Sequence, residues 1–276
     1  MGALRQLSAE QQVALLFLIV FGLLAAVSVV LLLLSLRERQ PVWMQRHPQY
    51  PRDLRAVWIG TTVFWLAWIA GPIGATLLFG LFSFLALREF ITLMHTRRSD
   101  HRGLLAAFFV VLPVQYMLAG GRYFDLFSVF IPVYVFLAIP VISALAGDPT
   151  RFLERNAKIQ WGIMVCVYGL SHVPALLLLD FPRQQGRGAF LVFFLVVVAA
   201  IAQLVQEAAS RWLRRRPVAR AISRSFSYRA WMVGTLVASV AGAALYWITP
   251  FKAPQAFVMA LIAAGAGTMG EFVMQA

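Results

Sequence analysis

The sequence predicts an all-α protein, a polytopic bundle of about nine transmembrane helices. Hydrophobic residues make up 61% of the chain and Asp, Glu, Lys and Arg only 13%, against about 45–50% and about 25% in soluble globular domains. Apolar segments follow one another through all 276 residues, and most lysines and arginines fall between them. We therefore expect a single integral membrane domain spanning residues 1–276.

Glycine, proline and charged residues divide the chain into segments close to the roughly 20 residues that a membrane-crossing helix needs. The first apolar run, Val13 to Leu34, is longer than the core of a signal peptide, and Arg37-Glu38-Arg39 follows it instead of a cleavage site, so it should be retained. The second segment is short, and Gly71-Pro72 after it fits either a tight hairpin or a kink. The expected spans are residues 12–34, 56–71, 73–94, 104–120, 126–146, 159–179, 189–206, 231–249 and 256–275.

The basic residues predict the topology. With Arg88 counted in the connection that follows it, alternate connections hold 19 and 5 of the 24 lysines and arginines. Short cytoplasmic connections carry the excess, so the N-terminus is expected outside and the C-terminus in the cytoplasm. The net charge of +13 therefore indicates a membrane surface rather than nucleic acid. High arginine content without a transit peptide favours a bacterial inner membrane.

The longest polar connection, residues 207–230, is expected to be a cytoplasmic loop and holds seven arginines. Such clusters bind anionic lipid headgroups or simply enforce topology. Alternatively, guanidinium forks and hydroxyls at a helix start suit phosphate groups, and Ser223, Ser225 and Ser227 precede the eighth segment. Composition leaves both interpretations open.

A second polar position lies within an apolar segment. His172 stands beside Ser171 and before Pro174. A histidine at membrane depth next to a proline-loosened backbone suits a polar site, and it equally suits hydrogen bonding between helices. The only cysteine, Cys166, lies in the same apolar run, which excludes a disulfide framework and a cysteine zinc site within this chain.

Three segments carry a family resemblance: Ala86-Leu87-Arg88-Glu89-Phe90, Ser171-His172-Val173-Pro174-Ala175-Leu176-Leu177, and residues 203–234. Through them the chain resembles the phosphatidate cytidylyltransferases, or CDP-diacylglycerol synthases. These integral membrane transferases convert CTP and phosphatidate to CDP-diacylglycerol and pyrophosphate in phospholipid biosynthesis. The resemblance implies CTP and a membrane lipid, phosphatidate or another anionic lipid, as partners and Mg²⁺ as the cofactor.

The family signature is an Asp ending a helix, then Gly-Lys, then Ser-Pro-x-Lys-Thr-x-Glu-Gly-x-x-Gly-Gly leading into the next helix. Aligned without gaps, its spacing and helix context are kept, while most of its charged chemistry is replaced. In signature order, the aligned residues are Gln203 for the Asp, Ser210-Arg211 for Gly-Lys, Ser223, Arg224 for Pro, Phe226 for Lys, Ser227 for Thr, Arg229 for Glu, Ala230 for Gly, and Gly234.

The resemblance implies a site built on this connection and the last helix. Glu207 lies one helical turn beyond Gln203 and can share its face, while Glu271 follows Gly270 where the family has Gly-Asp. Glu207 and Glu271 are the expected Mg²⁺ ligands, and with Arg229 they are the expected catalytic residues. The expected substrate-binding residues are Gln203, Arg211, Ser223, Ser227 and His172.

Other functions stay open at this level. A non-catalytic relative would keep the bundle and use the arginine-rich connection to bind anionic lipid or a partner protein. A transporter is a third alternative, although the two halves show no repeated segment pattern. A homodimer is compatible with both the enzyme and the non-catalytic relative. The family continues beyond the Gly-acid pair into a Lys-Arg stretch and a Gly-x-Lys-Asp element, so we expect a C-terminally incomplete chain.

Overall fold

The computed structural model describes residues 9–37, 49–179, 188–213, 218, 222–223 and 226–275. The regular secondary structure of these residues is entirely helical, as the sequence predicts. The chain divides into two compact units, Met1–Leu179 and Asp180–Ala276. Each unit is described by itself.

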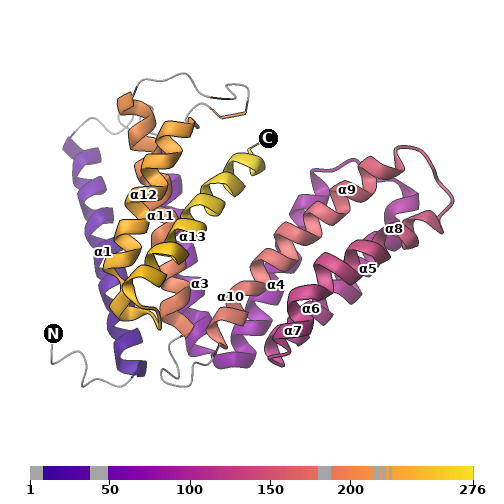
Figure 1. Ribbon diagram of the computed structural model, residues 1–276, viewed down its shortest axis with the longest axis horizontal. Helices are drawn as coiled ribbons and strands as arrows, with labels where there is room; N and C mark the ends of the chain where they lie inside the picture. The colour runs from indigo at the N-terminus through magenta and orange to yellow at the C-terminus, as the bar shows by residue number, and fades with distance from the viewer. Residues whose placement is uncertain are drawn as a thin grey trace. The chain divides into compact units, whose positions relative to one another are not determined.

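The described residues of the first unit form six helical stretches (Figure 1). Three are single helices, and three are built from several consecutive segments. The elements are α1 (Ala9–Arg37), α3 (Gln49–Ile69), α4 (Gly71–Thr92), η2 (Arg98–Asp100), α5 (His101–Ala106), η3 (Ala107–Val111), α6 (Leu112–Gly120), α7 (Phe124–Val129), η4 (Phe130–Val135), α8 (Phe136–Ala144), α9 (Phe152–Gly162), η5 (Ile163–Gly169) and α10 (Leu170–Leu177). The second unit contains α11 (Gly188–Leu213), α12 (Tyr228–Ala244), η6 (Tyr246–Ile248) and α13 (Ala253–Met274).

Each of the nine expected segments coincides with a helical stretch among the described residues. Seven of these stretches are long and apolar enough to cross a membrane, which makes the chain an integral membrane protein. The other two are shorter: the apolar part of α3 covers Val57–Ile69, and α12 has 17 residues. Crossing by these two helices therefore stays a prediction, as does the orientation of the termini.

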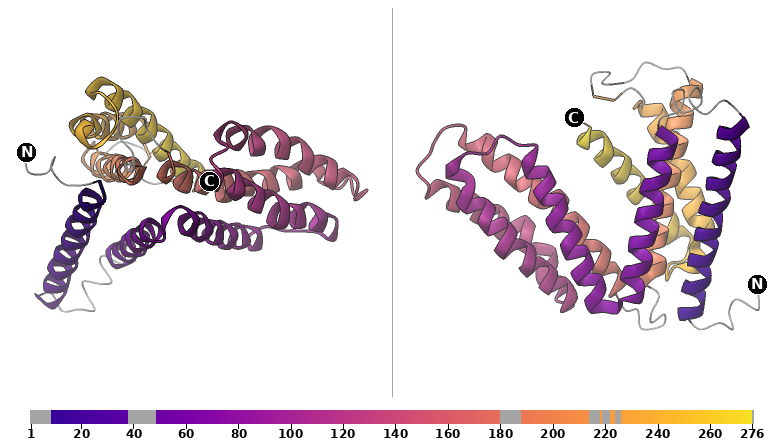
Figure 2. Two further views of the ribbon diagram at one scale, coloured as in Figure 1. Left: turned by 90° about the horizontal axis from the view of Figure 1, so that it is seen from below. Right: turned by 180° about the vertical axis from the view of Figure 1, so that it is seen from behind.

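The core of the first unit lies among α4, α5–α6, α7–α8 and α9–α10, which pack as a bundle (Figure 2). Its largest buried apolar side chains come from α4, η4, α8 and η5: Leu87, Ile131, Ile139, Ile163 and Val167. Outward-facing apolar side chains such as Leu77, Phe109 and Leu137 stay exposed. In a membrane these faces meet lipid, so their exposure costs nothing there.

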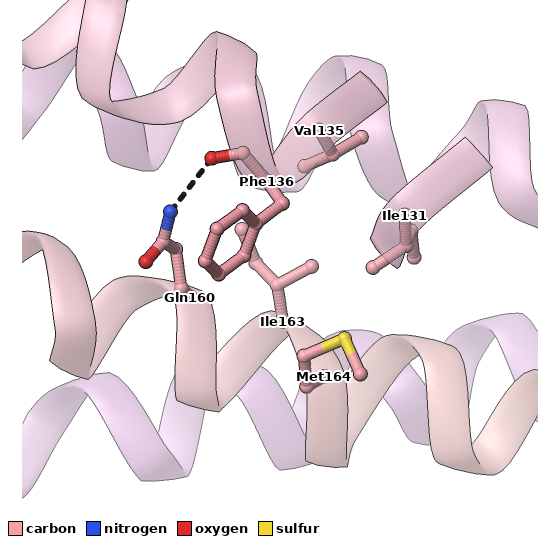
Figure 3. A pocket seen from close by; sticks show the side chains of 6 residues that line it. All are labelled: Ile131, Val135, Phe136, Gln160, Ile163 and Met164. Atoms are coloured by element: carbon pink, nitrogen blue, oxygen red, sulfur yellow. Dashed lines mark hydrogen bonds between the residues drawn. The ribbon is translucent and has the colours of Figure 1, made fainter. Parts of the chain in front are cut away.

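Three helical stretches of the first unit each contain a wide, π-helical segment: Ala107–Val111, Phe130–Val135 and Ile163–Gly169. Proline explains part of this irregularity, because it has no backbone N–H to donate to the carbonyl four residues earlier. Two such carbonyls receive a side-chain donor from the next stretch. Gln160 Nε2 donates to Phe136 O (2.8 Å), as Figure 3 shows. This carbonyl stands four residues before Pro140, which has no N–H to donate to it. In the same way, Tyr168 Oη donates to Ser128 O (2.9 Å), four residues before Pro132.

Aromatic contacts attach α1 to α3. The ring of Phe17 lies 5.2 Å from that of Phe64, and Phe21 lies 5.7 Å from Trp58. Trp58 Nε1 also donates a hydrogen bond to Ser28 Oγ (3.1 Å). Aromatic packing supplies a large contact area at low entropy cost, so a few rings hold this helix pair together.

The second unit is a bundle of α11, α12 and α13, in which the three helices pack against each other. Its core is lined by small residues: Ala202, Ala238, Ala260 and Ala264 are fully buried. At Gly234 a Cβ atom would lie 2.7 Å from Ala202 O and 3.0 Å from Gln206 Cβ. Small residues at helix contacts let backbones approach closely, which is how membrane helices gain packing energy.

Candidate functional site

One end of the second unit gathers the segments that the sequence singled out. The end of α11, the start of α12 and the end of α13 lie together there, because the three helices alternate in direction (Figure 1). Ser227 and Arg229 belong to the start of α12, and Glu271 belongs to the last turn of α13. The arrangement therefore brings these three residues to the same end of the same unit.

Ser227 has an evident local role as the cap of α12. Its backbone is extended (φ −139°, ψ 145°), and its Oγ accepts a hydrogen bond from Ala230 N at 3.3 Å. Serine is favoured at this position because it satisfies one of the free N–H groups of the first turn. The side chain is buried and its hydroxyl oxygen already accepts a hydrogen bond from the helix, so its first role is to cap α12.

Phe226 connects the start of α12 to the end of α13. Its ring stacks on that of Phe272, with 4.3 Å between the centroids and 27° between the planes. Phe226 is only 3% exposed, and its carbonyl accepts a hydrogen bond from Val218 N (3.1 Å). The position that holds a lysine in the family signature thus carries a buried ring, and this ring packs the end of the connection against the last turn of α13.

The two expected metal ligands are both exposed. Glu207 lies on α11, and its carbonyl accepts a hydrogen bond from Ser210 Oγ at 2.7 Å. Glu271 Oε1 accepts one from Gln275 Nε2 at 3.2 Å. Within the described ranges no three side chains of His, Cys, Asp or Glu form a metal-ligating group. Mg²⁺ is often held by one or two carboxylates plus substrate phosphates, and the roles of Glu207 and Glu271 as its ligands stay predictions.

The remaining expected residues of the second unit are divided between surface and interior. Gln203 on α11 and Arg229 on α12 are exposed, and Ser223 is buried. Arg211 lies on α11, and its side chain is outside the described part of the chain. The roles assigned to these residues stay predictions.

Gln206 and Thr235 are polar residues that the signature alignment did not single out. Gln206 is buried on α11 beside Gly234 of α12, and Thr235 is buried on α12 beside Gly265 of α13. Gln206 Oε1 and Thr235 Oγ1 have no hydrogen-bond partner in the described structure. The available signal was periodicity, because Val198, Ala202 and Gln206 follow each other at four-residue spacing and form the buried face of α11. Gln203 lies outside this buried face and is exposed.

His172 belongs to the first unit, whereas the other expected site residues belong to the second. Its Nδ1 is hydrogen-bonded to Tyr168 O (2.7 Å), and its ring packs edge-on against Tyr168 and Phe127. Beside it, Ser171 Oγ accepts a hydrogen bond from Gln115 Nε2 at 3.2 Å. These contacts fit the structural interpretation of His172, while its substrate-binding role stays a prediction.

Comparisons with known proteins agree with the resemblance of the sequence. A model described as the cytidylyltransferase family matches residues 51–276, a range that leaves out α1. The chain is also 33% identical over 223 residues to the uncharacterized protein YnbB of Escherichia coli (strain K12), covering 79% of this chain and 72% of YnbB. No solved structure matches the chain. Because the family match covers most of the sequence, the chain belongs to the cytidylyltransferase family.

Proposed function

We propose that this protein is a CTP-dependent phosphatidate cytidylyltransferase of a bacterial inner membrane. It would join the cytidylyl group of CTP to the phosphate of phosphatidate and release pyrophosphate. The reaction would take place at the end of the second unit that holds Ser227, Arg229 and Glu271, on the cytoplasmic side of the membrane. Family membership and the integral membrane fold support this proposal.

The stacked pair of Phe226 and Phe272 is the observation that carries the proposal. The arginine-rich connection is long and polar, and it could contribute to a site only if its end were held near Glu271. The ring pair supports this placement, because Phe226 precedes Ser227 and Phe272 follows Glu271. Positioning is the main requirement of nucleotidyl transfer, since phosphate charge must be neutralised at defined points.

The proposed roles follow from charge. Arg211 and Arg229 would neutralise phosphate oxygens in place of the family's lysine, because guanidinium groups bind phosphate through paired hydrogen bonds. Glu207 and Glu271 would meet a Mg²⁺ ion that enters with CTP. Gln203, Ser223 and Ser227 would contribute neutral hydrogen bonds. When bound, Mg²⁺ would supply charge neutralisation at the transferring phosphate.

A direct assay tests the proposal. Full-length protein in detergent is incubated with phosphatidate, Mg²⁺ and CTP labelled in the cytidine, and labelled CDP-lipid and pyrophosphate are measured. Product should form and should fall by at least about a hundredfold in Glu271→Gln, the loss expected for one electrostatic catalytic contact. Asp125→Asn removes an exposed acid of α7, outside the three segments that carry the family resemblance, and serves as the matched control, which should retain activity.

A non-catalytic relative is the second candidate, and one observation favours it: the signature lysine position holds the buried Phe226. The double variant Gln203→Asp/Arg229→Glu separates the two candidates, because it restores two acids of the signature at positions that are exposed and not part of the buried core. Restoring Phe226→Lys is less informative, since it would bury a charge and remove the ring stack. Absence of product from both the natural sequence and the double variant would refute the enzyme proposal and favour the non-catalytic candidate.

A further inference from the structure

The first unit gathers basic residues at one end from two connections that are about 50 residues apart in the sequence. The connection between α4 and α5 contributes exposed His95, Arg97 and Arg98, the first turn of α5 contributes exposed His101 and Arg102, and the connection between α8 and α9 contributes exposed Arg151. In the described chain no carboxylate lies within ion-pair distance of Arg98, Arg102 or Arg151.

A buried arginine ties the two connections together. Arg155, 7% exposed, lies 3.2 Å from Asp100 Oδ1 through its Nε. Its Nη1 lies 2.5 Å from Asp148 Oδ2 and 2.9 Å from Ser99 Oγ, and its Nη2 donates to Asp148 O at 2.9 Å. One guanidinium group thus binds both turns, and it fixes their positions relative to each other.

The same arrangement removes negative charge from the surface. Asp100 is buried against Arg155, and its Oδ2 accepts a hydrogen bond from Arg97 N (2.9 Å). Asp148 is held by Arg155, Ser99 and Thr150, and Glu154 pairs with Lys158 at 2.6 Å. All acids of the two connections are therefore paired, and the outward charge is positive.

Exposed leucines lie next to these arginines. Leu93, Leu145 and Leu153 are 80%, 74% and 81% exposed. Each lies at the end of a membrane-crossing segment: Leu93 follows the one that ends at Thr92, Leu145 follows the one that ends at Ala144, and Leu153 is the second residue of the one that begins at Phe152. Large exposed apolar side chains in the same connections as guanidinium groups suit the boundary of a bilayer, where leucine meets acyl chains and arginine reaches phosphate. A soluble phosphate or an acidic protein would not favour these leucines.

We propose that the end of the first unit formed by the α4–α5 and α8–α9 connections binds the phosphate headgroup of an anionic phospholipid. Arg98, Arg102 and Arg151 hold the phosphate, and the Arg155 cluster positions them. This surface is separate from the site proposed in the second unit, and its role does not depend on nucleotide chemistry.

Lipid binding can be measured without CTP. Full-length protein in a non-ionic detergent is titrated with dioleoylphosphatidylglycerol or with dioleoylphosphatidylcholine, and bound lipid is counted by native mass spectrometry. Phosphatidylglycerol should bind more tightly, and the triple variant Arg98→Gln/Arg102→Gln/Arg151→Gln should weaken its binding by about tenfold or more. The corresponding triple substitution to Lys keeps the charge and should retain most of the binding.

The control Arg183→Gln/Arg187→Gln/Lys252→Gln removes equal charge from connections on the other side of the predicted topology. It should change binding by less than about twofold. Equal binding of the two lipids, or equal losses in both triple variants, would overturn the proposal. Displacement of phosphatidylglycerol by excess inorganic phosphate would also overturn it, since the site would then be one for free phosphate. A melting temperature equal to that of the natural sequence excludes misfolding, and the Lys variant decides the matter if the Gln variant unfolds.

Discussion

The ring of Phe226 stacks on the ring of Phe272, joining the residue before the Ser227 cap of α12 to the last turn of α13. The contact is buried on the Phe226 side. It holds the end of the arginine-rich connection against the last turn of α13, the turn to which Glu271 belongs.

The stack predicts a measurable coupling. In a double-mutant cycle with Phe226→Leu and Phe272→Leu, the interaction free energy should be about 0.5–1.5 kcal/mol, as found for aromatic pairs beyond their buried area. Unfolding free energies in detergent provide the measurement. The control cycle pairs Phe226→Leu with Val273→Ala, whose side chain is 47% exposed. Additive effects in both cycles would show that the stack contributes nothing specific.

Gly234 should tolerate no larger residue. Gly234→Ala places a Cβ atom 2.7 Å from Ala202 O, and a backbone atom cannot move aside as a flexible side chain can. The loss of stability should be about 1–3 kcal/mol. Gly270→Ala is the matched control, because no atom lies within 4 Å of the added Cβ, and alanine favours a helix over glycine by about 1 kcal/mol. Equal melting temperatures for the two variants would contradict the close approach of α11 and α12.

The Gln160 side chain should matter only because of Pro140. Gln160→Leu leaves the Phe136 carbonyl without its donor, at a cost of about 1–2 kcal/mol. In a Pro140→Ala background the restored backbone N–H can bond that carbonyl, and the same substitution should cost much less. Thermal unfolding of the four proteins tests this. An identical cost in both backgrounds would mean that the bond does not replace the one lost to proline.

Arg155 should be among the least replaceable residues of the first unit. Arg155→Gln leaves the carboxylate of Asp100 buried and without its cation, which should cost about 3–5 kcal/mol. Lys158→Gln breaks an exposed pair one helical turn away, with side chains 44% and 48% exposed, and should cost less than about 0.5 kcal/mol. Chemical unfolding in detergent compares the two. A loss of similar size in both variants would show that the Arg155 cluster is no stronger than a surface pair.

Asp148 should make the first unit sensitive to acid. Hydrogen bonds from Thr150, and then from Arg155 and Ser99, hold the pKa of Asp148 well below its ordinary value. The stabilisation is therefore fully present above the unfolded pKa of about 4, and it is lost as the pH falls below that value toward the lower folded pKa. Asp148→Asn should lower the melting temperature at neutral pH, and its difference from the natural sequence should shrink below about pH 4. A difference that stays constant throughout an acid titration would contradict this.

Composition and spacing predicted the fold class and the helix positions, because a membrane-crossing helix satisfies its own backbone hydrogen bonds and needs only enough apolar residues in a row. All nine expected segments are helical for this reason. Their internal irregularities were not predictable in the same way. A proline indicates that a carbonyl loses its donor, and only the neighbouring helix decides that Gln160 or Tyr168 replaces it.

The site divides along the same line. By itself, the sequence determined the family, the position of Ser227 before the eighth segment and the replacement of a signature lysine by Phe226, since each depends on local order along the chain. The tertiary structure decided that Phe226 is buried against Phe272, that Gln206 rather than Gln203 faces α12, and that Arg155 joins two distant turns. Packing and ion pairing act between residues far apart in sequence, and the geometry of such contacts depends on the positions of whole helices.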